Sequence, residues 1–494
     1  MRGPGAEPLA ARRSGARFGA EPQGLRKVGV MRAFMDESFL LNSETAVALY
    51  GFCKDLPIID YHCHLIPQEI AENKRFENIT DLALRGDHYK WRLMRANGVE
   101  ERFITGNASD EEKFEQWCYT IEDCIGNPVY HWAHLEMQRY FGYDKPIAGE
   151  NAKDIFEHCN RIIARDDFSV WNIFRNYKVA QVGTTDDPAD TLEWHKKIAA
   201  SGEVGLPKVQ PTFRPSTLLD VGSPNFKAYL EKMGKQSGHN ITDWSSLLVS
   251  VAARIAFFKE MGCVSSDHAF DYPVFEEKGD EREIFARALK GESLSEQEVN
   301  RYKTAMMLWL GEQYAAKGWI MQLHIGAQRN NNSRMFGILG ADTGYDSMSD
   351  LPFSLQLARF LDELDKKNML PKTVLYALNP AFDDMLSVMI GNFQGGDVPG
   401  KMQWGSAWWF NDSKLGMERH LVTLANGGML ARFIGMLTDS RSFMSYPRHE
   451  YFRRILAQVV ARWVDNGEFP NDMGKLKKLM EGIAYYNAKE YFGV

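Results

Sequence analysis

The chain has 494 residues, of which 44% are hydrophobic and 25% are charged, and its formal net charge is −7 at pH 7. A chain of this length can bury a large core, and its acidic balance offers no basic surface for nucleic acid or an anionic membrane. No run approaches the roughly 18 consecutive apolar residues that span a bilayer. The six cysteines form no CxxC pair and are too sparse for a disulfide framework. We therefore expect a soluble, cytoplasmic protein with reduced thiols and no nucleic-acid or membrane partner.

Residues 1–34 differ from the rest of the chain, because they are rich in Gly, Ala and Arg and nearly free of acids. They lack the apolar core of a secretory signal. An Arg-rich leader can be a mitochondrial transit peptide, but we favour a disordered extension upstream of a start at Met31 or Met35. We expect residues 35–494 to form a single domain.

From residue 56 onward, short runs of β-forming residues that end in polar side chains alternate with stretches of helical spacing. This alternation predicts an α/β fold with a parallel sheet. The runs are Leu56 to His64, Val179 to Thr184, Val209 to Arg214, Val264 to Phe270, Ile320 to His324, Val374 to Asn379, Met402 to Trp408, and Phe433 to Thr438. Eight runs match a distorted (β/α)8 TIM-type barrel, whose active site would lie at the C-terminal ends of the strands.

Two long stretches between these runs are predicted to be helical. Residues 66–178, between the first and second runs, are far too many for one crossover helix and are rich in aromatic and charged residues. We interpret them as an inserted all-helical cap subdomain over one mouth of the barrel. The stretch Glu281 to Lys317 is also predicted to be helical, with a cap at Ser293.

The ends of the first and eighth runs carry candidate metal ligands. Alternation along a strand points His62 and His64 to the same side, and Asp439 follows the run that would close against strand one. Such a set suits one divalent metal, typically Zn²⁺, with Mn²⁺, Fe²⁺ or Co²⁺ also compatible. HxH alone is a weak signal, and Asp439 could instead cap a helix. The sixth run ends in Asn379, where a second metal would need a histidine, so we expect one metal.

Other strand ends carry groups that suit an anionic substrate. Arg214, Arg329 and Arg441 lie at or beyond strand ends, and guanidinium groups bind carboxylates in a bidentate way. A surface salt bridge is the alternative for each arginine. His324 is a further ligand, a substrate contact or a core histidine, while Trp408 either faces a ligand or belongs to the core. Three arginines at one rim favour a small anionic substrate.

In the predicted cap, His88 and Tyr89 place two side chains capable of acid–base chemistry next to each other. In an aromatic helix such residues usually serve packing. The bare pattern therefore does not decide between a packing role and a catalytic one.

Six longer motifs resemble those of the uronate (glucuronate) isomerases, a family of the amidohydrolase superfamily. The resemblance runs from about Met35 to the C-terminus. The motifs are Asp-Tyr-His-Cys-His-Leu at 60–65, Gly-Asp-His-Tyr-Lys-Trp-Arg at 86–92, Gly-Thr-Thr-Asp-Asp-Pro at 183–188, His-Ile-Gly-Ala-Gln-Arg-Asn-Asn-Asn at 324–332, Trp-Trp-Phe-Asn-Asp at 408–412, and Leu-Thr-Asp-Ser-Arg-Ser-Phe at 437–443.

The resemblance implies an aldose–ketose isomerase of hexuronate catabolism. It would convert D-glucuronate to D-fructuronate and D-galacturonate to D-tagaturonate through a cis-enediol. The resemblance also implies one divalent metal, held by His62, His64 and Asp439. His88, Tyr89 and Arg441 match the family's positions for substrate handling and proton transfer, and with Asp439 they form the expected catalytic set.

We expect Arg214, His324, Arg329 and Trp408 to bind the substrate, and a homo-oligomer is possible. Two other functions compete with the isomerase. One is a metal-dependent hydrolase of the amidohydrolase type, although the fourth run lacks the lysine that often bridges two metals in such enzymes. The other is a non-catalytic sugar-acid-binding protein, which would be expected to have lost the ligand residues that are present here.

Overall fold

The computed structural model describes residues 32–277, 279–396 and 398–494. Most of the predicted N-terminal extension, residues 1–31, lies outside the described residues. The chain divides into two compact units, Met1–Phe39 and Leu40–Val494. The described part of the first unit contains only turns and irregular backbone, and all of the elements below belong to the second.

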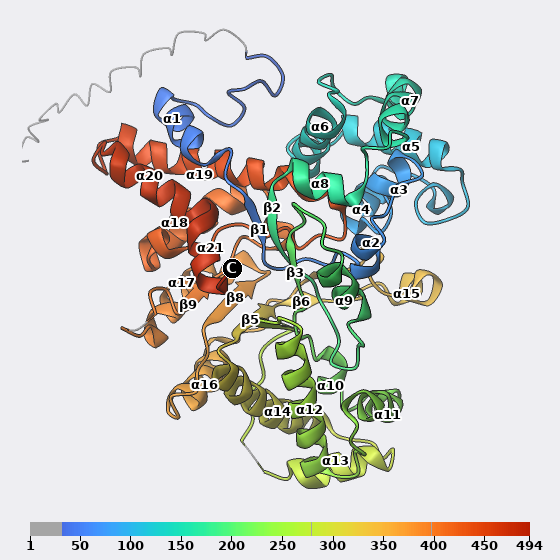
Figure 1. Ribbon diagram of the computed structural model, residues 1–494, viewed down its shortest axis with the longest axis vertical. Coiled ribbons are helices and arrows are strands. Elements are labelled where there is room, and N and C mark those ends of the chain that lie inside the picture. Colours follow the sequence, from blue (N-terminus) through green and yellow to red (C-terminus); the bar gives the residue numbers. More distant parts are fainter. Residues whose placement is uncertain (1–31, 278, 397) are drawn as a thin grey trace, which may run out of the picture. The chain divides into compact units, whose positions relative to one another are not determined.

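Seven of the eight predicted runs contain strands, and these strands form two parallel sheets (Figure 1). The first sheet has the order β1-β2-β3 and the second has the order β4-β5-β8-β9. The strands are β1 (Ile58–Asp60), β2 (Val179–Gly183), β3 (Lys208–Gln210), β4 (Ser265–Phe270), β5 (Ile320–Ile325), β8 (Thr373–Ala377) and β9 (Met402–Trp404). Two short antiparallel strands, β6 (Ala327–Gln328) and β7 (Ser347–Met348), belong to an excursion after β5.

Backbone hydrogen bonds connect the two sheets beyond the end of β3. The amide of Phe213 donates to the carbonyl of Ser265 at 3.1 Å, and its carbonyl accepts from the amide of Asp267 at 3.0 Å. Parallel bridges on both sides of Phe213 complete the connection. The third run therefore continues beyond its assigned strand and adjoins β4.

The predicted eighth strand, Phe433 to Thr438, is not formed. Gly435 has φ of 76° and Asp439 has φ of 47°, values that a β-strand does not contain. The segment nevertheless lies beside the continuation of β1, because the amide of Asp439 donates to the carbonyl of His62 at 3.2 Å and that of His64 to the carbonyl of Ser440 at 2.9 Å. The left-handed backbone at Gly435 and Asp439 thus prevents regular strand pairing, and only isolated hydrogen bonds join this segment to residues 62–64.

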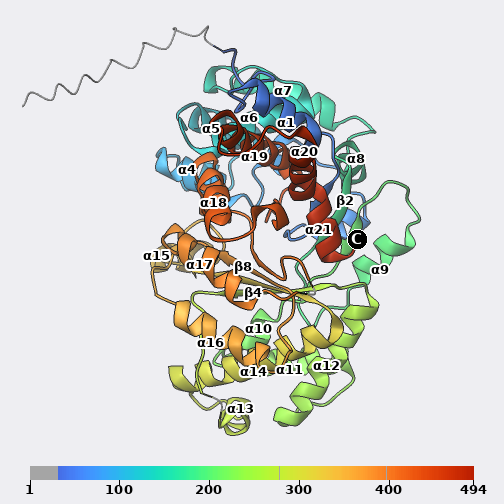
Figure 2. The same cartoon turned by 90° about the vertical axis from the view of Figure 1, so that its left-hand side faces the viewer.

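Residues 66–178 contain helices and no strand. These helices are α2 (Pro67–Ala71), α3 (Ile79–Ala83), α4 (His88–Ala96), α5 (Asp110–Glu122), α6 (Pro128–Phe141), α7 (Ala152–Ile163) and α8 (Val170–Asn176). In Figure 2, α4 to α7 lie on one side of the second sheet and α11 to α14 on the other. The all-helical content of this segment agrees with its aromatic, charged sequence.

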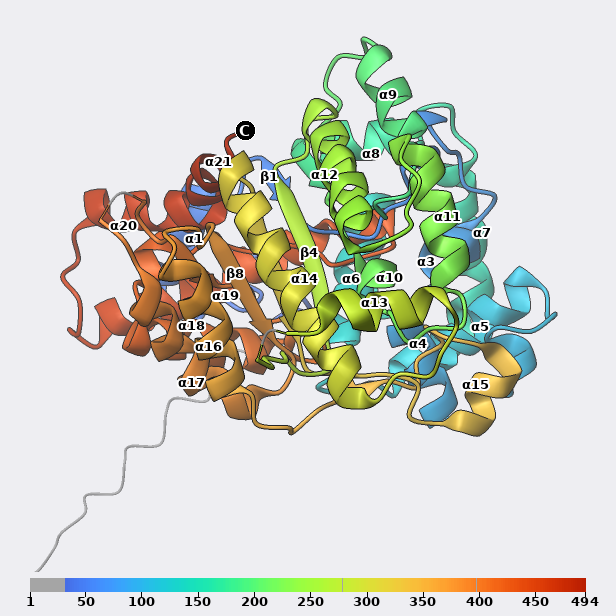
Figure 3. The ribbon, with the colours of Figure 1, turned by 90° about the horizontal axis from the view of Figure 1, so that it is seen from below.

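The remaining helices follow or precede the strands. They are α1 (Glu44–Cys53), α9 (Glu193–Ala200), α10 (Ser216–Leu219), α11 (Phe226–Ser237), α12 (Trp244–Glu260), α13 (Glu281–Leu289), α14 (Glu296–Lys317), α15 (Ser333–Leu339), α16 (Ser354–Asp365), α17 (Asp383–Met389), α18 (Lys414–Gly427), α19 (Pro447–Asp465), α20 (Met473–Glu481) and α21 (Asn487–Phe492). Figure 3 shows α12 and α14 beside β4. Among the described residues, no helix is both long and apolar enough to cross a membrane.

The helical stretch Glu281 to Lys317 begins its second helix at a different cap from the predicted one. Ser295, not Ser293, precedes α14, where its hydroxyl accepts from the amide of Glu298 at 3.3 Å and its amide donates to the Glu298 carboxylate at 2.7 Å. Both serines have a Glu three residues later, Glu296 and Glu298, but only Ser295 precedes the helix and forms the reciprocal contacts of a capping box.

Gly183 is required where β2 passes β1. A Cβ at this position would lie 2.4 Å from the carbonyl oxygen of Tyr61, which is backbone and cannot rotate away. We expect Gly183→Ala to lower the unfolding free energy by roughly 1–3 kcal/mol and to weaken metal binding, since Tyr61 precedes His62. Thermal unfolding and zinc titration would measure both effects. Gly51→Ala is the control, because its Cβ meets no atom within 4 Å; equal stability of the two variants would contradict the prediction.

Candidate active site and metal centre

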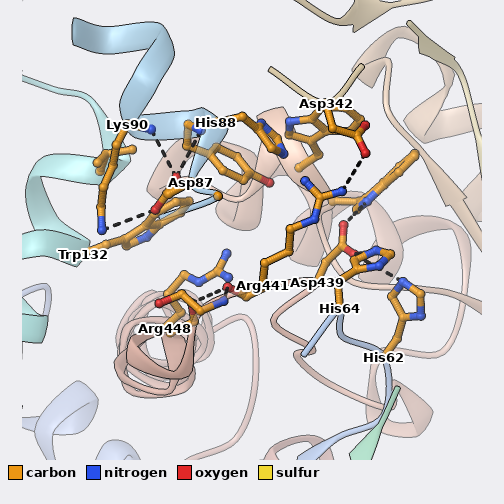
Figure 4. Close-up of a pocket in the computed structure, with 18 of the residues that line it drawn as sticks. His62, His64, Asp87, His88, Lys90, Trp132, Asp342, Asp439, Arg441 and Arg448 are labelled. Carbon is orange, nitrogen blue, oxygen red and sulfur yellow. Dashed lines mark hydrogen bonds and ion pairs between the residues drawn. The ribbon is translucent and has the colours of Figure 1, made fainter. Parts of the chain in front are cut away.

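The C-terminal ends of the strands open into one pocket of about 910 Å³, a volume that includes solvent at its mouth. All ten predicted site residues line this pocket: His62, His64, His88, Tyr89, Arg214, His324, Arg329, Trp408, Asp439 and Arg441. They lie at or beyond the C-terminal ends of strands, beyond the segment 433–438, in the first turn of α4 or in the excursion after β5 (Figure 4). The fold therefore brings together residues from seven separate parts of the sequence.

His62, His64 and Asp439 converge on one point. Oδ1 of Asp439 lies 3.2 Å from Nε2 of His62 and 3.0 Å from Nε2 of His64. Ligand atoms at about 2.0–2.1 Å from a tetrahedral Zn²⁺ lie roughly 3.3 Å from one another, so the spacing fits a shared ion. Asp439 Oδ1 is buried and has no hydrogen-bond partner among the described residues, as expected for a ligand atom. The three side chains form a candidate metal site.

The protonation states of Asp439 and His64 suit metal binding. At His62 burial lowers the pKa, but the Asp267 and Asp439 carboxylates outweigh it and raise the pKa of the imidazole. Burial opposes ionisation of Asp439, but the contacts with His62 and His64 outweigh it and hold the pKa of the carboxyl well below its usual range. Burial lowers the pKa of His64 to about 4. Near pH 7 the cluster therefore offers a carboxylate and, at His64, a neutral imidazole, which are the forms that bind metals.

Asp439 is held in place by the residue before it. Its φ of 47° is left-handed, a conformation that needs support from its surroundings. The amide and hydroxyl of Thr438 both donate to the buried Asp60 carboxylate at 2.7 Å, and the carbonyl of Thr438 accepts from Arg448 at 2.7 Å. Trp408 Nε1 donates to Asp439 Oδ2 at 2.6 Å. These contacts fix both the backbone and the carboxylate.

A second chain of polar contacts lies next to this cluster, where the rings of His62 and His324 have centroids 4.6 Å apart. His324 Nδ1 contacts Asp267 Oδ1 at 2.7 Å, and Arg214 Nη1 donates to Asp267 Oδ2 at 2.8 Å. Burial opposes ionisation of Asp267, but Arg214 and the nearby imidazoles hold the pKa of its carboxyl well below the usual range. With His62, Asp267 and His324 form a second group close enough to hold an ion. Asp267 was not predicted from the sequence, because it lies in the middle of the fourth run and only the folded structure brings it to Arg214 and His324.

His88 and Tyr89 enter the pocket from the start of α4. Asp87 caps this helix by accepting from the amides of Tyr89 and Lys90, both at 3.1 Å. The rings of His88 and Tyr89 stack with centroids 4.8 Å apart. Burial lowers the pKa of His88 and raises that of Tyr89 well above its usual range. Near neutral pH the pair therefore combines a protonated hydroxyl with a neutral imidazole.

Arg441 and Arg329 reach the pocket mouth. Arg441 Nη2 lies 3.0 Å from Asp342 Oδ2, and Arg329 Nη1 lies 3.4 Å from Asp342 Oδ1. Both arginines are partly exposed, at 39% and 37%. Asp342, which the sequence analysis also missed, belongs to the excursion between β6 and β7, and nothing in its local sequence distinguishes it.

Comparison with known proteins gives a consistent result. The sequence profile of the glucuronate isomerase family matches residues 31–492. Uronate isomerase from Caldanaerobacter subterraneus subsp. tengcongensis is 51% identical over 467 residues, which cover 94% of this chain and all of the relative. Uronate isomerase from Pectobacterium carotovorum is 50% identical over 468 residues, with the same coverage.

Solved structures agree with the sequence relatives. The crystal structure of uronate isomerase from Thermotoga maritima is 36% identical, with a TM-score of 0.88, and the match covers 93% of this chain and 100% of that one. The structure of glucuronate isomerase from Caulobacter crescentus is 25% identical, with a TM-score of 0.86, over 93% and 97% of the two chains.

A parallel α/β fold whose strand ends surround a His/His/Asp cluster, a stacked His–Tyr pair and several arginines is typical of an enzyme. The extent of the matches also specifies which kind. The chain belongs to the glucuronate isomerase family, and the prediction of a uronate isomerase is confirmed.

Proposed function

We propose that this pocket interconverts aldose and ketose hexuronates, D-glucuronate with D-fructuronate and D-galacturonate with D-tagaturonate, as a step of hexuronate catabolism. One observation carries the proposal. A single pocket combines the His/His/Asp cluster, the stacked His88 and Tyr89 pair and two half-exposed arginines. A sugar acid presents a carbonyl end and a carboxylate end, and the pocket has groups suited to each.

The chemistry requires ring opening, removal of a proton from C2 and return of a proton to C1 through a cis-enediol. Such a reaction needs a base, an acid near the carbonyl oxygen and electrostatic support for the enediolate. We assign these roles jointly to Asp439, His88, Tyr89 and Arg441. The protonated hydroxyl of Tyr89 can donate to an oxygen, and the neutral imidazole of His88 can accept a proton.

We propose that one divalent metal, Zn²⁺ with Mn²⁺, Fe²⁺ or Co²⁺ as alternatives, is held by His62, His64 and Asp439. When bound, it would polarise or orient the oxygens at C1 and C2. The protein's own contribution is to hold the ligands, since the contacts of Thr438 and Trp408 fix Asp439 independently of any ion.

Substrate binding is assigned to Arg214, His324, Arg329 and Trp408, together with Arg441. Arg214 and Trp408 already contact Asp267 and Asp439, so they would meet the substrate with their remaining surfaces. Arg329 and Arg441 are the more exposed cations at the pocket mouth. We therefore place the substrate carboxylate between these two guanidinium groups.

The wider architecture is proposed on the same basis. The contacts of Phe213 between the two sheets, and those of residues 438–440 beside residues 62–64, support one closed, distorted (β/α)8 barrel. We propose that residues 35–494 form a single domain, with residues 66–178 as a helical cap whose helix α4 contributes His88 and Tyr89. We also propose a cytoplasmic enzyme, a location that the composition and the metabolic role support.

The deciding experiment is a proton NMR time course of the purified chain with D-glucuronate in D₂O, with and without added Zn²⁺ or Mn²⁺. Appearance of a ketose uronate with deuterium at the exchanged carbon would support isomerisation through an enediol. An unchanged substrate across several uronates and metals would exclude the proposal, whereas release of an acid or amine from a cleavable substrate would favour a hydrolase.

Removing the Arg441 guanidinium should weaken use of the substrate. Loss of a charge-assisted hydrogen bond to a carboxylate corresponds to about 10- to 100-fold in kcat/KM, which is the decrease expected for Arg441→Met. Steady-state kinetics with D-glucuronate would measure it. Arg441→Lys keeps the positive charge but cannot bind a carboxylate in a bidentate way, so its kcat/KM should lie between those of Arg441→Met and the wild-type enzyme. Unchanged kcat and KM in Arg441→Met would remove this residue from the substrate site.

A further inference from the structure

Asp342 places a carboxylate between two arginines at the mouth of the pocket. Each of its oxygens faces a different guanidinium, with Oδ2 3.0 Å from Arg441 and Oδ1 3.4 Å from Arg329. Figure 4 shows the Arg441 side chain extending across the pocket to reach it. A sugar-acid carboxylate has the same charge and the same two oxygens, so it would compete for the same donors.

The loop does not need the Asp342 side chain to keep its shape. Arg92 of α4 donates to the carbonyls of Gly344 at 3.0 Å and Asp346 at 2.7 Å, and Arg95 donates to that of Thr343. The Asp346 carboxylate accepts from the amide of Asn330 at 2.7 Å. The backbone after residue 342 is therefore anchored by other groups, and the Asp342 carboxylate can rotate away without opening the loop.

Asp342 is also the most accessible member of its ion-pair cluster. Its side chain is 47% exposed, whereas that of Asp346 is 5% exposed. Ion pairs in contact with water contribute little net stability, because solvent replaces each lost contact. The Asp342 contacts are therefore weak enough for an incoming carboxylate to displace.

We propose that Asp342 is a placeholder for the substrate carboxylate: it pairs with Arg329 and Arg441 until the carboxylate of a sugar acid displaces it, and so it lowers the affinity for anionic substrates. This inference rests on the proposed function of the same pocket. It makes Asp342 an affinity-determining residue that opposes binding, unlike the arginines beside it.

The test is Asp342→Asn, which keeps the size of the side chain and removes its charge. The placeholder role predicts a KM for D-glucuronate about two- to fivefold lower than in the wild-type enzyme, since one weak, exposed competitor is lost. If Asp342 instead serves to position the arginines, the same substitution raises KM. A raised or unchanged KM would overturn the proposal.

Two further variants serve as controls. Asp346→Asn removes a buried carboxylate of the same loop, which accepts from the amide of Asn330 and also pairs with Arg329 at 3.4 Å, so it should raise KM by loosening both the loop and that arginine. Asp362→Asn removes one exposed charge on α16, outside the residues that line the pocket, and it should leave KM unchanged. A fall in KM that is equal in Asp342→Asn and Asp362→Asn would reflect net charge alone and would refute the placeholder role.

A binding measurement separates this inference from the proposed reaction. D-Gluconate carries the carboxylate but no carbonyl to isomerise, and D-glucitol is its neutral counterpart. Calorimetry should find gluconate binding strengthened about two- to fivefold in Asp342→Asn, with glucitol binding unaffected. The placeholder role would be rejected if neither protein bound gluconate, or if the variant bound it no more tightly than the wild-type enzyme. This holds whether or not the wild-type enzyme isomerises D-glucuronate. Failure of isomerisation alone would reject only the reaction.

Discussion

Asp439→Asn should reduce kcat for D-glucuronate by about 10²- to 10⁴-fold, the range associated with loss of a positioned acid–base group. The substitution changes two properties of the site at once. An amide oxygen is a weaker ligand than a carboxylate, and it cannot accept a proton from carbon. Oδ1 of Asp439 lies within 3.2 Å of Nε2 of both His62 and His64, so the substitution also changes the candidate metal site.

Two measurements separate the roles of Asp439. Chelator competition gives the zinc affinity, and NMR gives the turnover and the exchange of the C2 proton. Weak metal binding with turnover restored at high Zn²⁺ would identify a ligand alone, whereas normal metal binding with lost turnover would identify a proton-transfer group. Asp362→Asn is a suitable control, since Asp362 pairs with Lys366 on α16. Near-normal turnover and metal binding in Asp439→Asn would contradict both roles.

The candidate metal ligands could be selected from the sequence because each follows from a local rule. Two histidines one residue apart on a strand share a face, and a strand end carries them to the rim. Asp439 could be selected from the sequence for the same reason, since it directly follows an apolar run. The arginines were predicted as a group, because several cations at one rim indicate an anionic substrate, whereas a single arginine could equally form a surface salt bridge.

Asp342 and Asp267 were missed for different physical reasons. Asp342 reaches the pocket through a loop between two short strands, and only the folded path of that loop brings it to Arg441. Asp267 lies on a predicted strand, but its importance comes from tertiary contacts with Arg214 and His324. Neither the backbone path nor those contacts can be read from spacing along the chain.

The fold could be predicted where strand patterns are regular. Buried β-branched and apolar runs specified seven strands, and the length of the first crossover revealed the helical segment. The eighth run has the same apolar pattern but contains Gly435, and its Thr438 amide bonds to the Asp60 side chain instead of a strand partner. A side chain that replaces a backbone acceptor is not visible in a hydrophobicity pattern.

The second large effect concerns Arg448, which lines the same pocket and bonds to the residue before Asp439. Its side chain is 5% exposed, pairs with Asp412 at 2.7 Å and donates to the carbonyl of Thr438 at 2.7 Å. Arg448→Met would leave the buried Asp412 without its partner, and the loss of one member of a buried pair costs about 3–5 kcal/mol. We expect a marked fall in the thermal unfolding temperature.

The same variant should also disturb the site, because the carbonyl of Thr438 loses its donor next to the left-handed Asp439. Loss of a residue that orients a ligand typically lowers metal affinity by about 10- to 100-fold, and zinc titration would show whether this occurs. The double variant Arg448→Met, Asp412→Leu separates the two effects. It removes both buried charges, so stability should recover, whereas metal affinity should remain low because the Thr438 carbonyl still lacks its donor. Recovery of both would mean that Arg448 acts only by neutralising Asp412, and that the conformation of Asp439 is maintained by Asp60 and Trp408 alone.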